Sequence, residues 1–394
     1  MPKHGFVLST IVIMGAALMA EQLGRTITLG PPPLGPYSTA VRAGGFIYVS
    51  GTLGTGDDGR PAGPTVGEQT TAALRRIGSA LEAAGSSLAN AASVMVYLRR
   101  AGDFAAMNEV YRTFWASDPP TRTTVIADLP LAGALVEISV VAVAGGGERA
   151  VIHPDGWSRS PNPYSYGIRS GDTLFLSGLV ARDVRANTAV EGDVAAQLDV
   201  IMKNGGDILR AAGLGFGDVV SAKVFLSDAA DFQAMNEAYR ARFPSRPPAR
   251  ATVRAGLASP SHTVEVTLVA VGGTKDVVST GGRPNPNLSA AIRAGDRLFV
   301  SGMLGATDAT RGDAGAQTRQ TLARIDATLQ AAGFSRADVV EGLVYLTDFA
   351  HYGPMNDAYR AFFGKDFPAR STVGAGLFNP DGLVEIMCTA VKPR

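Results

Sequence analysis

Apolar segments of strand length recur three times along the chain. GGFIYVSG, from Gly44 to Gly51, carries β-branched and aromatic residues between glycines, which predicts a β-strand. Its counterparts are DTLFLSG, which ends at Gly178, and DRLFVSG, which ends at Gly302. A second apolar segment follows in each copy: SVMVYL from Ser93, SAKVFL from Ser221 and EGLVYL from Glu341. The pattern therefore predicts two strands in each copy of a threefold repeat.

A long amphipathic helix is predicted between these two strands. Thr65 and Glu68 have the spacing of a capping box, and an apolar stripe from Leu74 to Ala84 ends at Gly85. The third copy repeats this stripe. The second copy does so less cleanly, because two consecutive glycines at 205–206 interrupt its helix and should weaken it by about 1 kcal/mol each.

A shorter helix is predicted after the second strand of each copy, from Asp103, from Asp231 and from about His351. Two further strands then carry an arginine and a glutamate at the same interval of 15 residues. The pairs are Arg122 and Glu137, Arg250 and Glu265, and Arg370 and Glu385. Each copy thus has the order β, β, α, β, α, β, β, an α+β unit with two helices on one face of a mixed sheet.

The triplication divides 394 residues into three units of ordinary domain size. We place the domains at residues 21–147, 148–273 and 274–394, called repeats 1, 2 and 3 below. Segments rich in Gly, Pro, Ser and Asn at 145–163 and 272–286 are the predicted linkers.

Composition limits the partners and cofactors. The 36 basic and 35 acidic residues give a formal net charge of +1, so no global field attracts nucleic acid or an anionic membrane. The single cysteine, Cys388, excludes an intrachain disulfide, and only four scattered histidines accompany it. These counts argue against a Cys/His zinc site, and we expect no metal.

Residues 1–20 have the order of an export signal. Basic residues precede an apolar run from Phe6 to about Gly15, and small residues follow. The run is short for a membrane span. Leu18 lies at the −3 position for cleavage after Ala20, which leaves a plain N-terminal extension or a misplaced start codon as the alternative. We expect an exported, periplasmic protein if the segment is a signal, and a cytoplasmic one otherwise.

Two explanations of the repeated arginine and glutamate are open. If their strands pair as a hairpin, the two side chains meet as an ordinary ion pair. The alternative is a ligand site: Glu137 lies between Val136 and Ile138 in an alternating strand, which places its carboxylate on a partly buried face. A buried charge must be paired or used. Arginine suits a planar carboxylate, and a neighbouring carboxylate can hold and polarise water.

The second explanation favours a small anionic substrate and a water-dependent step. No histidine, cysteine or serine–histidine set repeats, so covalent catalysis on the usual plan is unsupported.

Other polar residues repeat as well. One asparagine recurs on each short helix, among methionines and tyrosines expected in the core. Such an asparagine is more often a buried hydrogen-bonding brace than a ligand contact. The three are Asn108, Asn236 and Asn356. Serine–glycine pairs end a strand, where glycine allows either a close backbone approach to a ligand or a simple turn: Ser50 and Gly51, Ser177 and Gly178, and Ser301 and Gly302. Threonines two residues after each arginine are candidates to supply a hydroxyl: Thr124, Thr252 and Thr372.

In their order, GPYSTAVRAGGFIYVSG, the VYL and DFAAMNEVYRTFW block, PTRTTV and ALVEI resemble the Rid (YjgF/YER057c-type) family of enamine/imine deaminases. All three copies match in order. The resemblance implies a chorismate-mutase-like α+β domain that forms trimers with ligand clefts between neighbouring subunits. This chain would then fold as a single-chain pseudo-trimer and act as a monomer.

The resemblance also implies roles for residues. The arginines at 122, 250 and 370 would bind a substrate carboxylate, and the glutamates at 137, 265 and 385 would position the attacking water. A tyrosine that reaches into the cleft from the adjacent subunit matches Tyr37 and Tyr164. The third copy has Asn287 in its place, so one cleft should differ.

The implied activity is hydrolysis of a 2-imino acid or its enamine to ammonia and a 2-keto acid, with no cofactor. A binding module for small carboxylates, without turnover, and a specialised enzyme that cleaves another C–N bond are the alternatives. Endoribonuclease activity, which some members have, is disfavoured by the balanced charge and by the lack of a basic, aromatic-interleaved stretch. We expect a small carboxylate as the partner, with no nucleic acid and no stable membrane association.

Overall fold

The computed structural model describes residues 25–29, 33–281 and 284–393. The predicted export signal at residues 1–20 lies outside them. Within these ranges, no helix has the length and apolar character needed to cross a membrane.

Each repeat has the predicted order of elements. Repeat 1 contains β2 (Ala40–Ala43), β3 (Phe46–Leu53), α2 (Val66–Ala83), β4 (Ala91–Leu98), α3 (Phe104–Phe114), β5 (Thr121–Ile126) and β6 (Val136–Val143). Repeat 2 contains β8 (Gly167–Ser170), β9 (Thr173–Leu176), α4 (Val194–Ala211), β12 (Val219–Leu226), α5 (Phe232–Arg240), β13 (Ala249–Arg254) and β15 (Val264–Val271). Repeat 3 contains β17 (Ala291–Ala294), β18 (Arg297–Leu304), α6 (Ala314–Ala331), β19 (Val339–Leu346), α7 (Tyr352–Phe363), β20 (Ala369–Gly374) and β21 (Val384–Val391).

Short strands lie outside this common set. Three of them add to the outer edges of the sheets: β1 (Thr26–Ile27), β7 (Ala150–Ile152) and β16 (Asp276–Val278). The last two fall in the segments expected to be linkers, which are therefore partly strand. The others are β14 (Gly256–Leu257) and the hairpin of β10 (Arg182–Asp183) and β11 (Thr188–Ala189).

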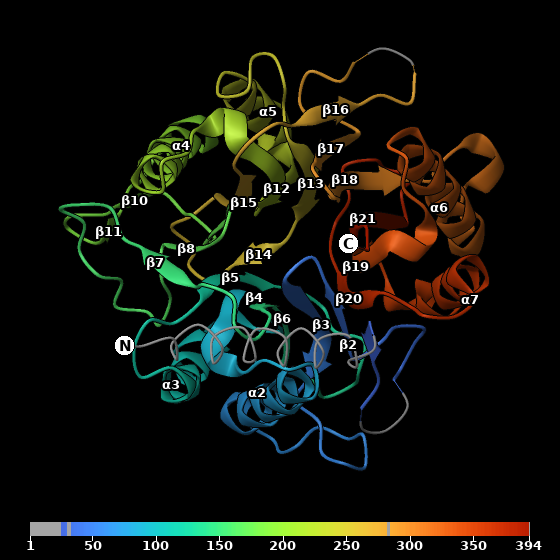
Figure 1. The fold of residues 1–394 in the computed structure, drawn as a ribbon, viewed down its shortest axis with the longest axis horizontal. Coiled ribbons are helices and arrows are strands. Elements are labelled where there is room, and N and C mark those ends of the chain that lie inside the picture. The colour runs from blue at the N-terminus through green and yellow to red at the C-terminus, as the bar shows by residue number, and fades with distance from the viewer. Residues whose placement is uncertain (1–24, 30–32, 282–283, 394) are drawn as a thin grey trace, which may run out of the picture.

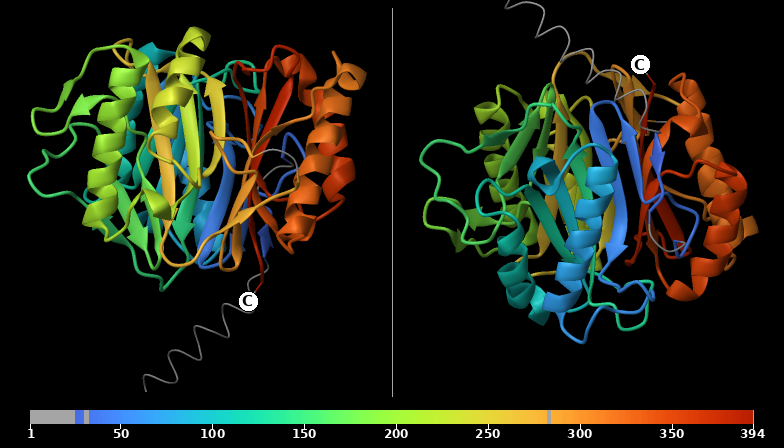
Figure 2. Two further views of the ribbon diagram at one scale, coloured as in Figure 1. Left: turned by 90° about the horizontal axis from the view of Figure 1, so that it is seen from above. Right: turned by 60° about the horizontal axis from the view of Figure 1, so that its bottom comes forward.

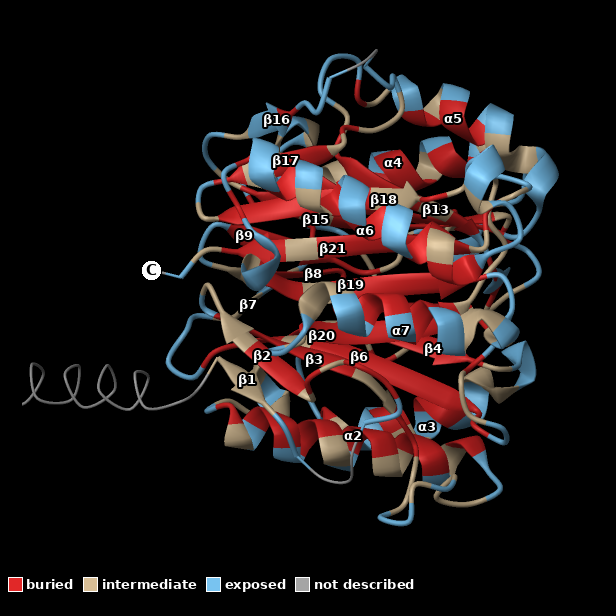
Figure 3. Cartoon of the chain, turned by 90° about the vertical axis from the view of Figure 1, so that its right-hand side faces the viewer, coloured by how far each residue is buried: buried red, intermediate tan, exposed pale blue. Residues whose placement is uncertain are grey.

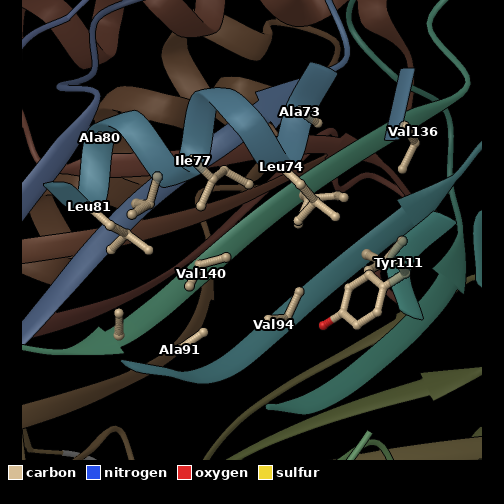
Figure 4. Packing of buried hydrophobic residues seen from close by; sticks show 14 of the residues in the cluster. Ala73, Leu74, Ile77, Ala80, Leu81, Ala91, Val94, Tyr111, Val136 and Val140 are labelled. Carbon is tan, nitrogen blue, oxygen red and sulfur yellow. The ribbon is translucent and has the colours of Figure 1, made fainter. Parts of the chain in front are cut away.

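The long helices form where the sequence predicts them. Helix α2 begins after Thr65, whose hydroxyl accepts a hydrogen bond from the Glu68 N–H while the Glu68 carboxylate accepts one from Thr65 N–H. Its apolar side, which includes Leu74 and Ile77, packs on the sheet (Figure 4). Helix α4 runs without a break through the two glycines at 205–206. The expected interruption is absent because packing of the apolar face outweighs the glycine propensity.

The order of strands in the sheet corrects one expectation. In repeat 1, β4 lies between β5 and β6, parallel to β5 and antiparallel to β6. Arg122 lies opposite Val94 and Glu137 opposite Tyr97, so both are neighbours of β4 rather than of each other. The hairpin considered as one explanation for these two strands therefore does not form. The helix before β5 makes a crossover that allows parallel pairing with β4, and this occupies the place that a hairpin would need.

The three sheets surround a common centre, and the helices lie outside them (Figures 1 and 2). Clusters of buried side chains join each sheet to its helices, and a further cluster joins the three repeats. Figure 3 shows that most strand residues are buried and that each helix has a buried and an exposed side. The central cluster contains Tyr97, Phe225 and Tyr345, one from each repeat. Short backbone bridges link neighbouring repeats near it: β5 with β14, Asp128 with Gly374, and Arg254 with Gly376. The repeats therefore share one interior.

Candidate active sites between the repeats

The arginine of one repeat lies near the glutamate of the next. We call these places cleft A (Arg122 and Glu265), cleft B (Arg250 and Glu385) and cleft C (Arg370 and Glu137). The ion pairs among the described residues include none that joins these arginines to these glutamates. The interpretation as a structural ion pair within each repeat is thus wrong, because each arginine lies near the glutamate of another repeat.

Cleft A encloses a cavity of about 120 Å³. Repeat 1 contributes Arg122 and Thr124 to its lining, and repeat 2 contributes Tyr164, Gly178 and Glu265. The Thr124 N–H donates to Glu265 Oε1 at 3.4 Å, which links the two sides.

Serine hydroxyls hold each arginine strand against the next repeat. Ser177 Oγ accepts a hydrogen bond from the Arg122 N–H at 2.9 Å and donates to the Ser165 carbonyl at 2.7 Å. The same pair of bonds is made by Ser301 with Arg250 and by Ser50 with Arg370. The buried serines therefore tie the repeats together, and their hydroxyls are already used.

The glycine after each serine gives room to the glutamate. A Cβ at Gly178 would lie 1.9 Å from Glu265 Oε1, and Gly51 and Gly302 have the same relation to their own glutamates. The close approach considered for these glycines is thus to a carboxylate of the protein.

The guanidinium of each arginine is buried against aromatic rings. In cleft A, the Arg122 Cζ lies 4.8 Å from the Tyr111 ring centroid and 5.9 Å from that of Tyr164. In cleft C, the Arg370 Cζ lies 4.8 Å from the Tyr359 centroid and 5.3 Å from that of Tyr37. The tyrosines at 37 and 164 therefore lie beside the arginine of the preceding repeat around the ring.

Each guanidinium keeps buried N–H groups that have no hydrogen-bond partner in the described part of the chain: Nη1 of Arg122, Nε and Nη1 of Arg250, and Nε and Nη2 of Arg370. Burial lowers the pKa of Arg122 and Arg250, but an arginine side chain stays charged in proteins. Buried donors without partners are rare. A charged one is suited to bind an anion through a pair of N–H groups.

Burial raises the pKa of all three glutamates, Glu137, Glu265 and Glu385, to about 8. The threonine N–H in clefts A and C and the facing arginine act in the opposite direction but do not cancel this effect. A carboxyl group with such a pKa can exchange a proton with a reactant near neutral pH.

Hydroxyl and amide groups complete the arginine side. The Oγ1 atoms of the threonines at 124, 252 and 372 are buried and, within the described ranges, without a partner. Asn236 Oδ1 accepts a hydrogen bond from Arg250 Nη2 at 2.6 Å, as expected of a brace. Asn108 donates to Asn162 at 3.3 Å, whereas the Oδ1 atoms of Asn108 and Asn356 find no partner among the described residues.

Cleft B differs from the other two. Asn287 Oδ1 accepts a hydrogen bond from Arg240 Nε at 3.1 Å, on the exposed side of α5. Phe232 stacks on Phe378 of repeat 3 with ring centroids 4.1 Å apart. In the corresponding places repeats 1 and 2 have proline at 130 and alanine at 258. Cleft B thus has Asn287 at the position of the tyrosines at 37 and 164, and it has an aromatic pair between repeats 2 and 3.

Two groups of residues near the clefts escaped the sequence analysis. Gln197 donates to the Ser261 carbonyl at 3.1 Å and accepts from the Thr263 N–H at 2.9 Å, which fixes the loop before the Glu265 strand. The glutamines at 69 and 317 make the equivalent hydrogen bonds. The three glutamines recur at the same spacing as the three arginines, and this repeat in the sequence could have identified them. The other group, Arg182 and His262, lines cavity A and does not repeat.

Comparison with known proteins identifies the family. Residues 28–144, 158–272 and 282–392 each match the family described as Endoribonuclease L-PSP, to which the Rid and YjgF proteins belong. The chain belongs to this family. It contains the family's domain three times.

Relatives match about one repeat each. A 2-iminobutanoate/2-iminopropanoate deaminase from Homo sapiens is 36% identical over 111 residues, which cover 28% of this chain and 81% of the relative. Protein DfrA from Myxococcus xanthus is 38% identical over 125 residues, 31% of this chain and 95% of the relative. A crystal structure of a chorismatase is similar over 77% of this chain and 93% of its own, with a TM-score of 0.52 and 17% identity, which shows a likeness of fold. Family membership and the deaminase relative support imine deaminase-like activity in general terms.

Proposed function

We propose that this protein hydrolyses small 2-imino acids, or their enamine tautomers, to ammonia and 2-keto acids, and that clefts A and C are the main sites. The observation that carries the proposal is the facing arrangement in cleft A. A buried guanidinium, with an N–H that has no partner among the described residues, and a carboxyl group with a pKa of about 8 line the same cavity. This arrangement offers an anion site and a proton-transfer group to one small molecule.

The arginine binds the substrate carboxylate. The ring of Tyr111 fixes the guanidinium plane in cleft A, so little side-chain entropy is lost on binding. The Oγ1–H of Thr124 is a further donor for the same carboxylate. Because Arg122, Thr124 and Glu265 are buried and line the same small cavity, this grip also sets the position of the neighbouring C=N carbon.

The glutamate handles water and protons. The Glu265 carboxylate removes a proton from a water molecule as the water oxygen adds to the C=N carbon, and the carboxyl group then gives this proton to the nitrogen. In the resulting carbinolamine Glu265 carries the hydroxyl proton to the nitrogen in the same way, and ammonia leaves as the C–N bond breaks and the C=O bond forms. Imine and water give keto acid and ammonia, so atoms and charges balance with no oxidant or cofactor.

The chain supplies both sides of every cleft, and we propose that it acts as a monomeric pseudo-trimer. The substrate is expected to be small, because cavity A measures about 120 Å³. A net charge of +1 and a single buried guanidinium on the arginine side suit a small carboxylate better than the regular phosphates of RNA.

Ammonia release tests the proposal. An amino-acid oxidase converts 2-aminobutanoate into its imine, and ammonia formation is followed with and without the protein, with the oxidase rate held fixed. We expect faster ammonia release with the protein and none of that increase with a variant in which all three arginines are alanine. If the protein binds 2-oxobutanoate but leaves the rate unchanged, it is instead a non-catalytic carboxylate-binding module.

Export also stays a proposal. It rests on the signal-like order of residues 1–20, and sequencing the N-terminus of the protein made in its own host tests it. A mature chain that begins between residues 18 and 21 supports export, whereas one that begins at Met1 refutes it.

A further inference from the structure

We propose that cleft A is specific for imino acids with a second carboxylate, which Arg182 and His262 bind at the opposite end from Arg122. This inference rests on the proposed deaminase function and adds a substrate class to it. Both residues line the same cavity as Arg122 and Glu265. Among the lining side chains to which the catalytic scheme gives no role, Arg182 carries a full positive charge and His262 offers an imidazole.

Arg182 is held in place with one end of its guanidinium free. Its Nε and Nη2 donate to Asn187, to Oδ1 and to the carbonyl, each at 2.6 Å. Its own carbonyl accepts a hydrogen bond from Asn204 Nδ2 at 2.9 Å. No hydrogen bond among the described residues involves Nη1. The side chain is therefore oriented before a ligand arrives, which lowers the cost of binding one.

His262 offers a second donor beside this guanidinium. Its side chain is only 6% exposed, and its Nδ1 is buried with no partner within the described ranges. Burial and the nearby charge of Arg182 lower the pKa of the imidazole, so the ring is neutral at physiological pH. A neutral imidazole has one N–H, and a carboxylate bound to Arg182 can accept a hydrogen bond from it.

The charges of cleft A fit a dianion. Arg122 and Arg182 place two positive charges in the lining of one cavity, and each can pair with its own carboxylate. A substrate with a single carboxylate, bound to Arg122, leaves the partly buried Arg182 guanidinium without a bound anion. A dicarboxylate balances both, and buried charges gain most from such pairing.

The other clefts lack this combination. The position of Arg182 is Thr55 in repeat 1 and Ala306 in repeat 3, and that of His262 is Ala134 and Gly382. In repeats 1 and 3 an arginine of the long helix bonds close to this position: Arg76 donates to Thr55 at 2.9 Å, and Arg324 donates to the Leu304 carbonyl. The natural sequence of the other repeats thus provides matched substitutions for the test.

The experiment uses the full chain with Arg250→Ala and Arg370→Ala, so that cleft A alone is measured. Oxidases generate the imines of glutamate and of 2-aminobutanoate, and kcat/KM is measured for each. We expect a preference for the glutamate imine. Arg182→Ala and His262→Ala should each lower the ratio of the two kcat/KM values, by about 10- to 100-fold for the arginine, as for loss of a charged hydrogen bond.

Arg185→Ala is the charge control. Arg185 is exposed on the same hairpin and lies outside the cavity lining, so its loss should leave the ratio unchanged. A ratio that stays constant in both test variants, or that falls equally with Arg185→Ala, overturns the inference.

Binding separates failure of this inference from failure of the proposed function. Calorimetry with 2-oxoglutarate and 2-oxobutanoate needs no turnover. If neither imine is hydrolysed but 2-oxoglutarate binds more tightly and loses that advantage in Arg182→Ala, the site stands and the deaminase function falls. If the imines are hydrolysed with no preference and both keto acids bind equally, the function stands and this inference falls.

Discussion

Ionisation of Glu265 should set the pH dependence of cleft A. Its pKa is raised to about 8 by burial, so below pH 8 the carboxyl group is mainly protonated and cannot accept a proton from water. With that pKa, about one carboxyl in eleven is ionised at pH 7, half at pH 8 and about ten in eleven at pH 9. The value of kcat/KM should therefore rise about fivefold from pH 7 to 8 and about tenfold from pH 7 to 9.

The assay needs a protein in which cleft A works alone. Arg250→Ala and Arg370→Ala silence the other clefts, and the spontaneous hydrolysis of the imine is subtracted at each pH. Glu265→Gln keeps the shape of the side chain but cannot take up a proton. It should abolish the pH-dependent rise and lower kcat/KM by about 10²- to 10⁴-fold, the usual contribution of a general base.

Two results would refute this reasoning. A corrected kcat/KM that is flat from pH 7 to 9 would show that the ionised carboxylate is not required. A fall over the same range, with a midpoint near pH 8, would assign the protonated form as the active one and make Glu265 an acid. In either case the arginine site would be unaffected, and only the role of the glutamate would change.

The same pKa shift also affects stability. The free energy of unfolding should change with pH in the opposite direction to kcat/KM. A raised carboxyl pKa means that the native state holds a proton which the unfolded chain releases between pH 4.5 and about 8. The free energy of unfolding should therefore fall as pH rises through this window. Glu265→Gln should reduce that fall, measured by urea unfolding at pH 5 and pH 8. An unchanged difference between the two pH values would contradict the shift.

Further substitutions test single contacts. Arg122→Lys in the cleft A protein should lower kcat/KM about 10- to 100-fold, because a lysine lacks the paired N–H groups; an unchanged value would contradict the carboxylate role. Gly178→Ala should lower kcat about 100-fold by displacing the Glu265 carboxylate, with little change in binding of 2-oxobutanoate. Ser177→Ala should lower the free energy of unfolding by about 2–4 kcal/mol in urea titrations, because two buried groups lose their partner. Asn287→Tyr should raise the activity of a protein in which only cleft B is intact.

Much of the fold was predictable because the signals are local. The capping box of Thr65 and Glu68 and the apolar stripe that follows define α2 without reference to the rest of the chain. The order of strands was not predictable in this way. Strands β5 and β6 are neighbours in sequence, yet β5 pairs with β4, and that pairing depends on a helix crossover and on packing between distant segments.

The candidate site was predictable in its members and not in their pairing. The arginine and the glutamate keep the same interval in every copy because their strands flank the same central strand of the sheet, which is β4 in repeat 1. The interval therefore reflects the fold of one repeat. The glutamate that faces Arg122 is Glu265 of the next repeat, and only the family resemblance indicated a cleft between repeats. Arg182 and His262 were missed because a residue that occurs in one repeat alone has no internal comparison.

The differences between the clefts lie on one side. The arginine side of each cleft, with its arginine, its threonine and the tyrosine below the guanidinium, is nearly the same in all three. The changes fall on the glutamate side: Asn287 and Phe378 of repeat 3 alter cleft B, and Arg182 and His262 of repeat 2 alter cleft A. In a trimer of identical chains each such change would appear in every cleft. In this chain it affects one cleft. Under the proposed function, the constant side would bind the carboxylate shared by the imino acids, and the variable side would select the remainder of the substrate.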